Sequence, residues 1–219
     1  MFDAQEPLHC SAALYFLDGQ YLFRYKHRKD QLISKFITSN DVKAAFSGSD
    51  EDSGWLSPGV MRCGTCEAGN WFVYYHSKAM MKLQFKASGP IREYEFIIPA
   101  TVLYQCGDST YLWAIKGKFE PSAPLYHAPF PNVYGDGRVC WGKNIIANTA
   151  AENAEKIWGL FFDSIFNNDL SNGKSLTYPH SVVKMYEDLK DANRKRYPTN
   201  DLMQTHMSVA DIPRRGRQL

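Results

Sequence analysis

The sequence predicts an α+β fold in which helices pack on one side of an antiparallel sheet. Three observations lead to this expectation. Short runs rich in aromatic and β-branched residues fill much of the chain before residue 120, and turn signals separate them. Strong amphipathic helical periodicity appears only after residue 140. Strands that precede the helices, rather than alternating with them, are typical of this fold class.

The first 54 residues are predicted to form a β-rich extension that ends in an exposed loop. Two apolar-aromatic runs within residues 12–27 are joined by Asp18-Gly19, a dipeptide typical of hairpin turns. Residues 31–38 predict a third strand. Residues 39–46 predict a short helix with Ser39 or Asn40 as its N-terminal cap.

The main domain is predicted over residues 55–191, and its first part is again rich in strands. The predicted strands cover residues 70–77, 80–87, 92–99, 101–108 and 110–117. Consecutive strands with tight connections pair antiparallel, since parallel pairing needs a crossover, so we expect a β-meander. Residues 118–132 then carry four prolines, which favour extended backbone and predict a stiff passage.

Two amphipathic helices follow this passage. Thr149 and Glu152 have the spacing of a capping box at the start of the first helix. Its apolar face is formed by Ala154, Ile157, Trp158, Phe161, Phe162 and Ile165. The second helix lies within residues 180–195 and is expected to bury Val182, Val183, Tyr186 and Leu189. Both apolar faces are expected to pack against the sheet.

Residues 192–219 are predicted to be a basic, disordered tail because they are polar and contain prolines. They hold six Lys or Arg against two Asp, a net charge of +4 that leaves −2 for the rest of a chain of net charge +2. A chain so close to neutral is not expected to bind nucleic acid. The tail could contact nucleic acid or an acidic partner through charge alone, but a solvated terminus is the simpler interpretation.

The composition also argues against a membrane protein and a disulfide-rich secreted protein. The N-terminus lacks a basic start, and its apolar run is too short for a signal peptide. The longest apolar run elsewhere, residues 96–104, contains a proline and is much shorter than a membrane span. Five cysteines in 219 residues do not suggest a disulfide framework. We therefore predict a cytoplasmic protein.

Cys140 closes a stretch, residues 127–142, that is too rich in proline and glycine to be a helix. Gly135 and Gly137 permit backbone conformations that other residues avoid. A cysteine between a glycine turn and helical structure is expected to be partly exposed, as a nucleophile must be. A buried, inert thiol is the alternative, since free cysteines are often buried.

Pro131, Asn132, Gly137 and Cys140 together resemble the active-site signature of ubiquitin-conjugating enzymes, where a His-Pro-Asn triplet leads through a glycine-containing turn to a thioester-forming cysteine. Residues 124–142 are similar to a bacterial branch of that superfamily known as PRTRC system protein B, and the resemblance extends over residues 55–170. Two departures stand out. Phe130 occupies the histidine position, and strands replace the long N-terminal helix of eukaryotic relatives, so partner docking cannot be transferred in detail.

The resemblance implies a conjugating enzyme that needs no cofactor or metal. Cys140 would accept a ubiquitin-like protein as a thioester from a ThiF-type activating enzyme and pass it to an amine or another nucleophile. Asn132 would stabilise the oxyanion, although an asparagine at a turn also bonds its own backbone. The resemblance further implies a JAB-type peptidase among the neighbouring genes and a location on a plasmid or other mobile element.

Four residues near Cys140 are candidate auxiliary groups: Asp136, His127, Tyr134 and Trp141. His127 is the nearest candidate for a general base, and Asp136 could orient an incoming amine. Tyr134 and Trp141 could line a channel for the extended tail of the ubiquitin-like protein. A turn-forming role for Asp136 and a surface or packing role for His127 are the simpler interpretations. For Tyr134 and Trp141, an exposed position or core packing is an alternative of equal weight.

Three other interpretations stay open. The protein could be an inactive binder of the ubiquitin-like protein, or a hydrolase that pairs Cys140 with His127 or His76. Cys63 and Cys66 form a CxxC pair, which would need a further ligand to make a tetrahedral zinc site. The candidates for that further ligand are Cys10, Cys106 and a histidine such as His76.

Overall fold

A computed structural model describes residues 11–27, 31–46, 55–66, 68–86, 89–143, 146 and 150–215. The loop predicted at 47–54, Cys10 and Thr149 of the predicted capping box lie outside the described residues. The chain divides into two compact units, residues 1–54 and 55–219. No helix in the described ranges is long and apolar enough to span a membrane.

The first unit contains three antiparallel strands followed by a helix, as predicted. The strands are β1 (Ala12–Leu17), β2 (Gln20–His27) and β3 (Gln31–Ile37), and the helix is α1 (Ser39–Phe46). The helix is capped one residue earlier than expected. Thr38 Oγ1 accepts a hydrogen bond from Asp41 N at 3.1 Å, and Asp41 Oδ2 accepts one from Thr38 N at 2.8 Å. Thr38 therefore replaces Ser39 and Asn40 as the cap.

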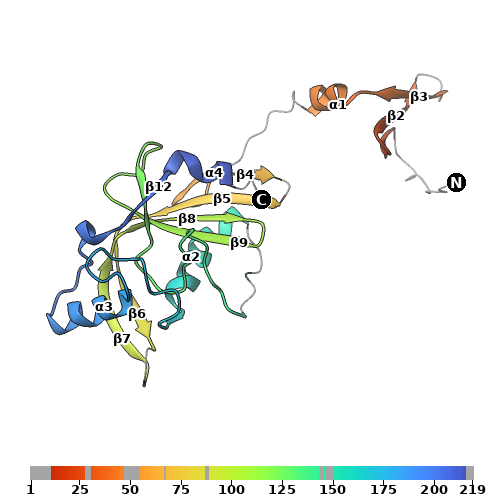
Figure 1. Ribbon diagram of the computed structural model, residues 1–219. Helices are drawn as coiled ribbons and strands as arrows, with labels where there is room; N and C mark the ends of the chain where they lie inside the picture. Colours follow the sequence, from red (N-terminus) through yellow and green to blue (C-terminus); the bar gives the residue numbers. More distant parts are fainter. Residues whose placement is uncertain are drawn as a thin grey trace. The chain divides into compact units, whose positions relative to one another are not determined.

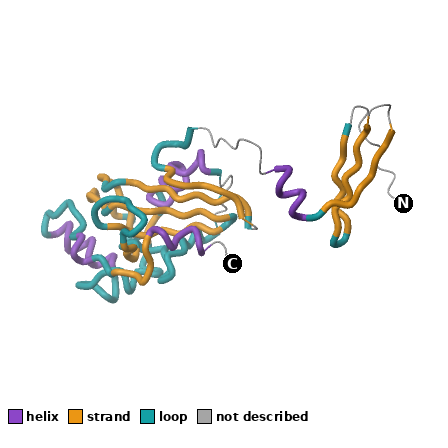
Figure 2. The backbone as a smooth tube through the Cα atoms, turned by 90° about the horizontal axis from the view of Figure 1, so that it is seen from above, coloured by secondary structure: helices purple, strands orange, loops and turns teal. Residues whose placement is uncertain are grey.

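The second unit is built on a six-stranded antiparallel sheet with the order β12-β10-β9-β8-β5-β4 (Figures 1 and 2). Its strands are β4 (Val60–Cys66), β5 (Gly69–His76), β8 (Ala100–Cys106), β9 (Ser109–Ile115), β10 (Pro124–His127) and β12 (Gln204–Ser208). A smaller sheet contains the hairpin of β6 (Ala79–Phe85) and β7 (Arg92–Ile98), with β11 (Ile165–Phe166) parallel to β6. The predicted α+β class is confirmed.

The strands do not form the single continuous meander that was predicted. The hairpin β6–β7 leaves the main sheet, and β5 pairs directly with β8. The hairpin buries its own apolar residues beneath α3, where the Phe96 and Tyr186 ring centroids lie 5.1 Å apart and those of Phe85 and Tyr186 5.3 Å apart. Local pairing signals predict strands well, but this helix packing decides which of them share a sheet.

The two main helices, α2 (Ala154–Phe162) and α3 (Val182–Asp191), belong to one aromatic-rich core with the main and small sheets. The predicted inward faces of both helices are buried, with one exception. Helix α2 ends at Phe162, so Ile165 falls in β11 and is 44% exposed. The Trp158 indole donates to Thr101 Oγ1 at 2.9 Å, which ties α2 to the main sheet.

The prediction of a disordered tail is wrong for residues 192–215. They contain a 3₁₀ turn (Thr199–Asp201), β12, a second 3₁₀ turn (Val209–Asp211) and α4 (Ile212–Arg215). Four apolar side chains anchor this segment in the interior: Tyr197, Leu202, Val209 and Ile212. Val209 and Ile212 join a second core on the face of the sheet opposite α2. The segment was predicted to be disordered because it is polar on average and its apolar anchors are widely spaced. Packing of these anchors against the rest of the unit holds the segment in place.

Candidate active site

The approach to Cys140 begins at Phe130, which is fully buried in the helix-side core. Its ring meets that of Phe162 edge-on with 5.0 Å between centroids and is stacked on that of Phe166 at 6.2 Å. The residue that replaces the family histidine therefore anchors the start of the loop by aromatic packing.

Asn132 has a left-handed backbone, with φ of 61°, a conformation that asparagine tolerates better than most residues. Its carbonyl accepts a hydrogen bond from Cys140 N at 2.7 Å, and its own N–H donates to Asp169 O at 3.2 Å. Its side-chain Nδ2 donates to Ile165 O at 3.4 Å. An amide nitrogen carries two N–H groups, so one of them has no partner among the described residues. Asn132 and Cys140 are thus joined through the backbone.

Gly137 sits where the loop crosses β9. Its φ is 92°, and an added Cβ would lie 2.5 Å from the Trp113 indole. Its carbonyl accepts from Leu112 N at 2.8 Å, and Val139 N donates to Thr110 O at 2.8 Å. These backbone bonds fasten the segment just before Cys140 to the rigid sheet, and only glycine fits the crossing point.

The turn between Tyr134 and Arg138 is stabilised from within. Tyr134 N donates to Arg138 O at 2.8 Å, and Asp136 Oδ1 accepts from Arg138 N at 3.0 Å. The second contact is an Asx turn, which is the simpler role predicted for Asp136. The Arg138 guanidinium lies over the Tyr134 ring, 4.7 Å from its centroid.

Cys140 is half-buried. The Tyr134 hydroxyl forms a hydrogen bond with the Cys140 side chain, and this bond is the main reason that the pKa of Tyr134 is raised. The charge of the Cys140 thiolate raises the pKa of Tyr134 further, while the Arg138 charge opposes the shift. The Tyr134 hydroxyl is therefore next to the Cys140 side chain.

Trp141 is anchored by a chain of hydrogen bonds. Its indole N–H donates to Thr110 Oγ1 at 2.9 Å, Thr110 donates to Gln105 Oε1 at 2.6 Å, and Gln105 Nε2 donates to Gly107 O at 2.7 Å. The ring also meets Phe161 edge-on at 6.3 Å. This arrangement supports the packing interpretation of Trp141.

Lys174 lies beneath the same loop and was not identified from the sequence. It is only 2% exposed, and its Nζ donates to Val133 O at 2.6 Å and to Tyr134 O at 3.3 Å. Burial lowers the pKa of Lys174 to about 8, while the charge of Asp136 acts in the opposite direction. Lysine is ordinarily exposed, and residues 171–177 carry no pattern that singles it out, so the sequence offered no signal for this contact.

Neither histidine considered for a hydrolase is paired with Cys140. His127 lies at the end of β10, where burial and then the charges of Lys174 and His206 lower its pKa. The His76 ring is stacked on that of Trp158 with 3.9 Å between centroids. No hydrogen bond joins either imidazole to the Cys140 sulfur within the described part of the chain.

The CxxC pair does not form a chelating site. Cys63 and Cys66 both lie in β4, where residues three apart point to opposite faces of a sheet. Cys63 packs against the helix-side core, whereas Cys66 packs against the opposite core, with its sulfur 3.5 Å from that of Cys106. Among the residues that the structure describes, no group of three or more potential metal ligands converges.

A family model described as prokaryotic E2 family D matches residues 34–205, which is more than three quarters of the chain. E2 is the usual term for a ubiquitin-conjugating enzyme. The matched region includes strands β4 to β11 of the second unit, the loop that carries Asn132 and Cys140, and helices α2 and α3, and it ends within β12. No curated protein and no solved structure matches the chain.

Proposed function

Because the chain belongs to prokaryotic E2 family D, we propose that it is a ubiquitin-like-protein conjugating enzyme with Cys140 as its thioester-forming residue. Membership of this family suggests a ubiquitin-conjugating-like function in general, with a ubiquitin-like protein and an activating enzyme as partners. The observation that supports Cys140 as the thioester-forming residue is its place in the loop. Cys140 is half-buried, and its backbone N–H donates a hydrogen bond of 2.7 Å to the Asn132 carbonyl.

In the first step, the Cys140 thiolate attacks the thioester carbonyl at the C-terminus of the ubiquitin-like protein. A new C–S bond forms, and the thiol of the activating enzyme leaves. In the second step an amine, or another nucleophile, attacks the same carbonyl, loses its proton to solvent, and releases Cys140 as a thiolate. Both steps pass through a tetrahedral oxyanion, which is the charge that the site must stabilise.

Asn132 is the proposed donor to that oxyanion. One of its amide N–H groups is held at Ile165 O, which orients the amide, and the other is available to a substrate. A donor of this kind is worth about 3 kcal/mol in comparable acyl-transfer sites. The left-handed backbone of Asn132 gives it a structural role as well, so the two roles coexist.

Tyr134 and Lys174 are proposed as positioning residues. The Tyr134 hydroxyl contacts the Cys140 side chain, and Lys174 holds the carbonyls of Val133 and Tyr134 from below. Both act on the short segment between Asn132 and Cys140. We expect them to fix the distance and orientation between the Cys140 thiol and the Asn132 side-chain amide.

The setting of the reaction is also part of the proposal. We infer a ThiF-type activating enzyme as the donor, and we retain the PRTRC-type assignment with its JAB-type peptidase and mobile element. The Cys–His hydrolase is less well supported, because His127 and His76 make other contacts. The inactive binder differs from the enzyme only in reactivity, so it is an outcome of the test.

The test mixes the purified protein with ATP, the ThiF-type enzyme and the ubiquitin-like protein encoded beside it. A non-reducing gel should show an adduct that dithiothreitol removes. Cys140→Ala should abolish the adduct, Cys140→Ser should give an ester that resists dithiothreitol, and Cys63→Ala should behave like the unmodified protein. Binding without any adduct would favour the inactive binder, and ATP-independent cleavage would favour the hydrolase.

A further inference from the structure

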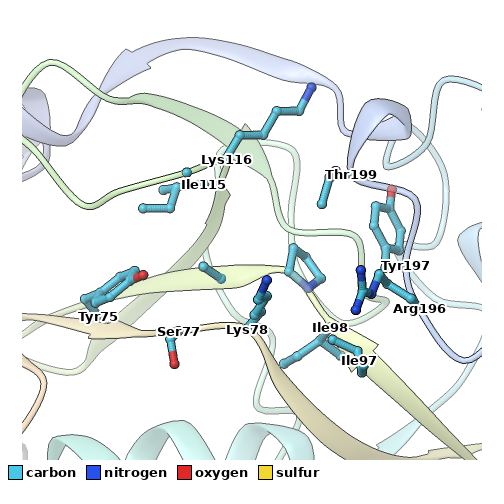
Figure 3. A pocket seen from close by; sticks show the side chains of 13 residues that line it. Tyr75, Ser77, Lys78, Ile97, Ile98, Ile115, Lys116, Arg196, Tyr197 and Thr199 are labelled. Carbon is cyan, nitrogen blue, oxygen red and sulfur yellow. The ribbon is translucent and has the colours of Figure 1, made fainter.

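A cavity of about 370 Å³, whose lining residues are shown in Figure 3, opens at the end of the main sheet that lies away from Cys140. Its walls come from the β5–β6 turn, the β7–β8 turn, the end of β9 and residues 196–199. Thr110 contacts the loop of Cys140, whereas Ile115 lines the cavity. These two residues of β9 are five positions apart, or about 17 Å. The cavity is therefore separate from the candidate active site.

The described lining of this cavity carries three cationic side chains and no carboxylate. The cations are those of Lys78, Lys116 and Arg196. None of the three has a carboxylate oxygen within 4.0 Å in the part of the chain that the structure describes. Lys78 and Arg196 both line the cavity, and both residues are exposed to solvent. Lys116 is half-buried, its ammonium lies 4.5 Å from the Tyr126 ring centroid, and in Figure 3 it points away from Lys78 and Arg196. Lys78 and Arg196 are thus the two lining cations that contact neither a carboxylate nor an aromatic ring among the described residues.

The backbone that carries Arg196 is held in place. Ile97 N donates to Lys195 O at 2.7 Å, and Tyr197 N donates to Ile97 O at 3.0 Å. These bonds align residues 195–197 with the end of β7 as a parallel bridge. The adjacent Tyr197 is buried, and its hydroxyl donates to Asp201 Oδ2 at 3.1 Å. Arg196 is therefore presented by a preorganised segment, which reduces the entropic cost of binding a ligand.

The rest of the lining is suited to an organic molecule. Apolar surface comes from Ile97, Ile98, Pro99, Ala100 and Ile115. Polar hydroxyl groups come from Tyr75, Ser77 and Thr199. Mostly apolar walls with a few polar groups, and a volume of roughly 300–1,000 Å³, are typical of small-molecule sites.

We propose that this cavity binds a small organic phosphate, with the phosphoryl group between Lys78 and Arg196 and the organic part against the isoleucine side chains. A phosphate monoester carries about −1.5 to −2 charges at pH 7, which matches these two cations. A monocarboxylate would leave one of the cations uncompensated. The planar guanidinium of Arg196 also has the geometry to donate two hydrogen bonds to phosphate oxygens.

The test is isothermal titration calorimetry of the full chain with adenosine monophosphate, which combines a phosphate with a flat organic body. We expect saturable binding at one site, weakened about tenfold or more by Lys78→Ala and by Arg196→Ala. Arg196→Lys should bind adenosine monophosphate with intermediate affinity, because it keeps the positive charge but loses the planar guanidinium that can donate two hydrogen bonds. Lys156→Ala, which removes an exposed lysine of α2, should bind as the unmodified protein does.

Titrations with ribose 5-phosphate, inorganic phosphate and adenosine show how much the phosphate and the organic part of the ligand each contribute to the affinity. Binding of ribose 5-phosphate that depends on Arg196 would support the proposal with a smaller organic group. Equal binding of adenosine and adenosine monophosphate would overturn it, because the phosphate would then contribute nothing. Absence of saturable binding by either phosphate ester up to about 10 mM would also overturn it. So would unchanged affinity in folded Lys78→Ala and Arg196→Ala variants, with circular dichroism confirming the fold. Cys140→Ala should not alter binding, which keeps this result distinct from thioester formation.

Discussion

Replacing the buried Lys174 by methionine should change how the stability of the protein depends on pH. The pKa of Lys174 falls from 10.5 to about 8 in the folded state because the ammonium is buried. As the pH rises, the folded state therefore releases this proton before the unfolded state does. Between about pH 8 and 10.5 the unfolded state binds more protons, so the stability of the wild-type protein rises across this window.

The size of this stability change follows from the pKa shift of Lys174. A difference of about 2.5 pKa units corresponds to about 3 kcal/mol over the full window, of which about 1.3 kcal/mol falls between pH 7 and pH 9. Lys174→Met removes this contribution, so its stability relative to wild type should decrease by that amount from pH 7 to pH 9. At pH 7 the substitution also leaves the Val133 carbonyl without its 2.6 Å donor, a loss of about 1–3 kcal/mol.

Urea unfolding at pH 7, 8 and 9, with a reductant present, measures both effects. Lys156→Met on the exposed face of α2 is the matched control and should follow wild type at every pH. If the stabilities of wild type and Lys174→Met changed in parallel between pH 7 and pH 9, Lys174 would not have the lowered pKa on which this reasoning depends. Unchanged thioester formation by a folded Lys174→Met variant would refute its positioning role.

Three further predictions concern the loop itself. Asn132→Ala should slow discharge of the Cys140 thioester about 100-fold in single-turnover assays. Asn132→Gly, which tolerates the left-handed backbone, should be equally slow. A glycine variant that discharges as fast as wild type would show that only the backbone conformation of residue 132 matters. Gly137→Ala should lower the free energy of unfolding by about 2–4 kcal/mol, because a Cβ there has both a positive φ and an overlap with an indole ring. Gly135→Ala, which meets nothing within 4 Å, should change the urea midpoint little, and equal losses in the two variants would contradict this account. Cys140→Ala should lower the pKa of Tyr134 by removing the bond that raises it, as followed by the NMR shift of the Tyr134 ring carbon that carries the hydroxyl; an unchanged titration would refute that contact.

Much of the fold could be predicted because the signals are local. The runs over residues 70–117 contain the residue types that favour a pleated, half-buried surface, and Asp18-Gly19 identifies the first hairpin. The inward face of α2 followed from helical periodicity up to Phe162. Strands β4, β10 and β12 were not predicted, because each depends on neighbours in the main sheet and has little alternation of its own.

The candidate site could be predicted only in part, for a similar reason. The spacing of Asn132, Gly137 and Cys140 along the chain indicated the reactive loop. What supports that loop comes from distant segments, such as Lys174 below it and Trp113 beside Gly137. No sequence spacing records these contacts, since they arise only when the chain has folded.

The pairing of β12 with β10 has a consequence for the integrity of the protein. Strand β10 is covered on one side by β9 and on the other by β12, and His127 N, close to the reactive loop, donates to Met203 O at 2.9 Å. Proteolytic removal of the residues after 202 would leave β10 as a bare edge with unsatisfied backbone groups, a template for self-association. Trimming the C-terminus should therefore promote aggregation and loosen the start of the loop that leads to Cys140.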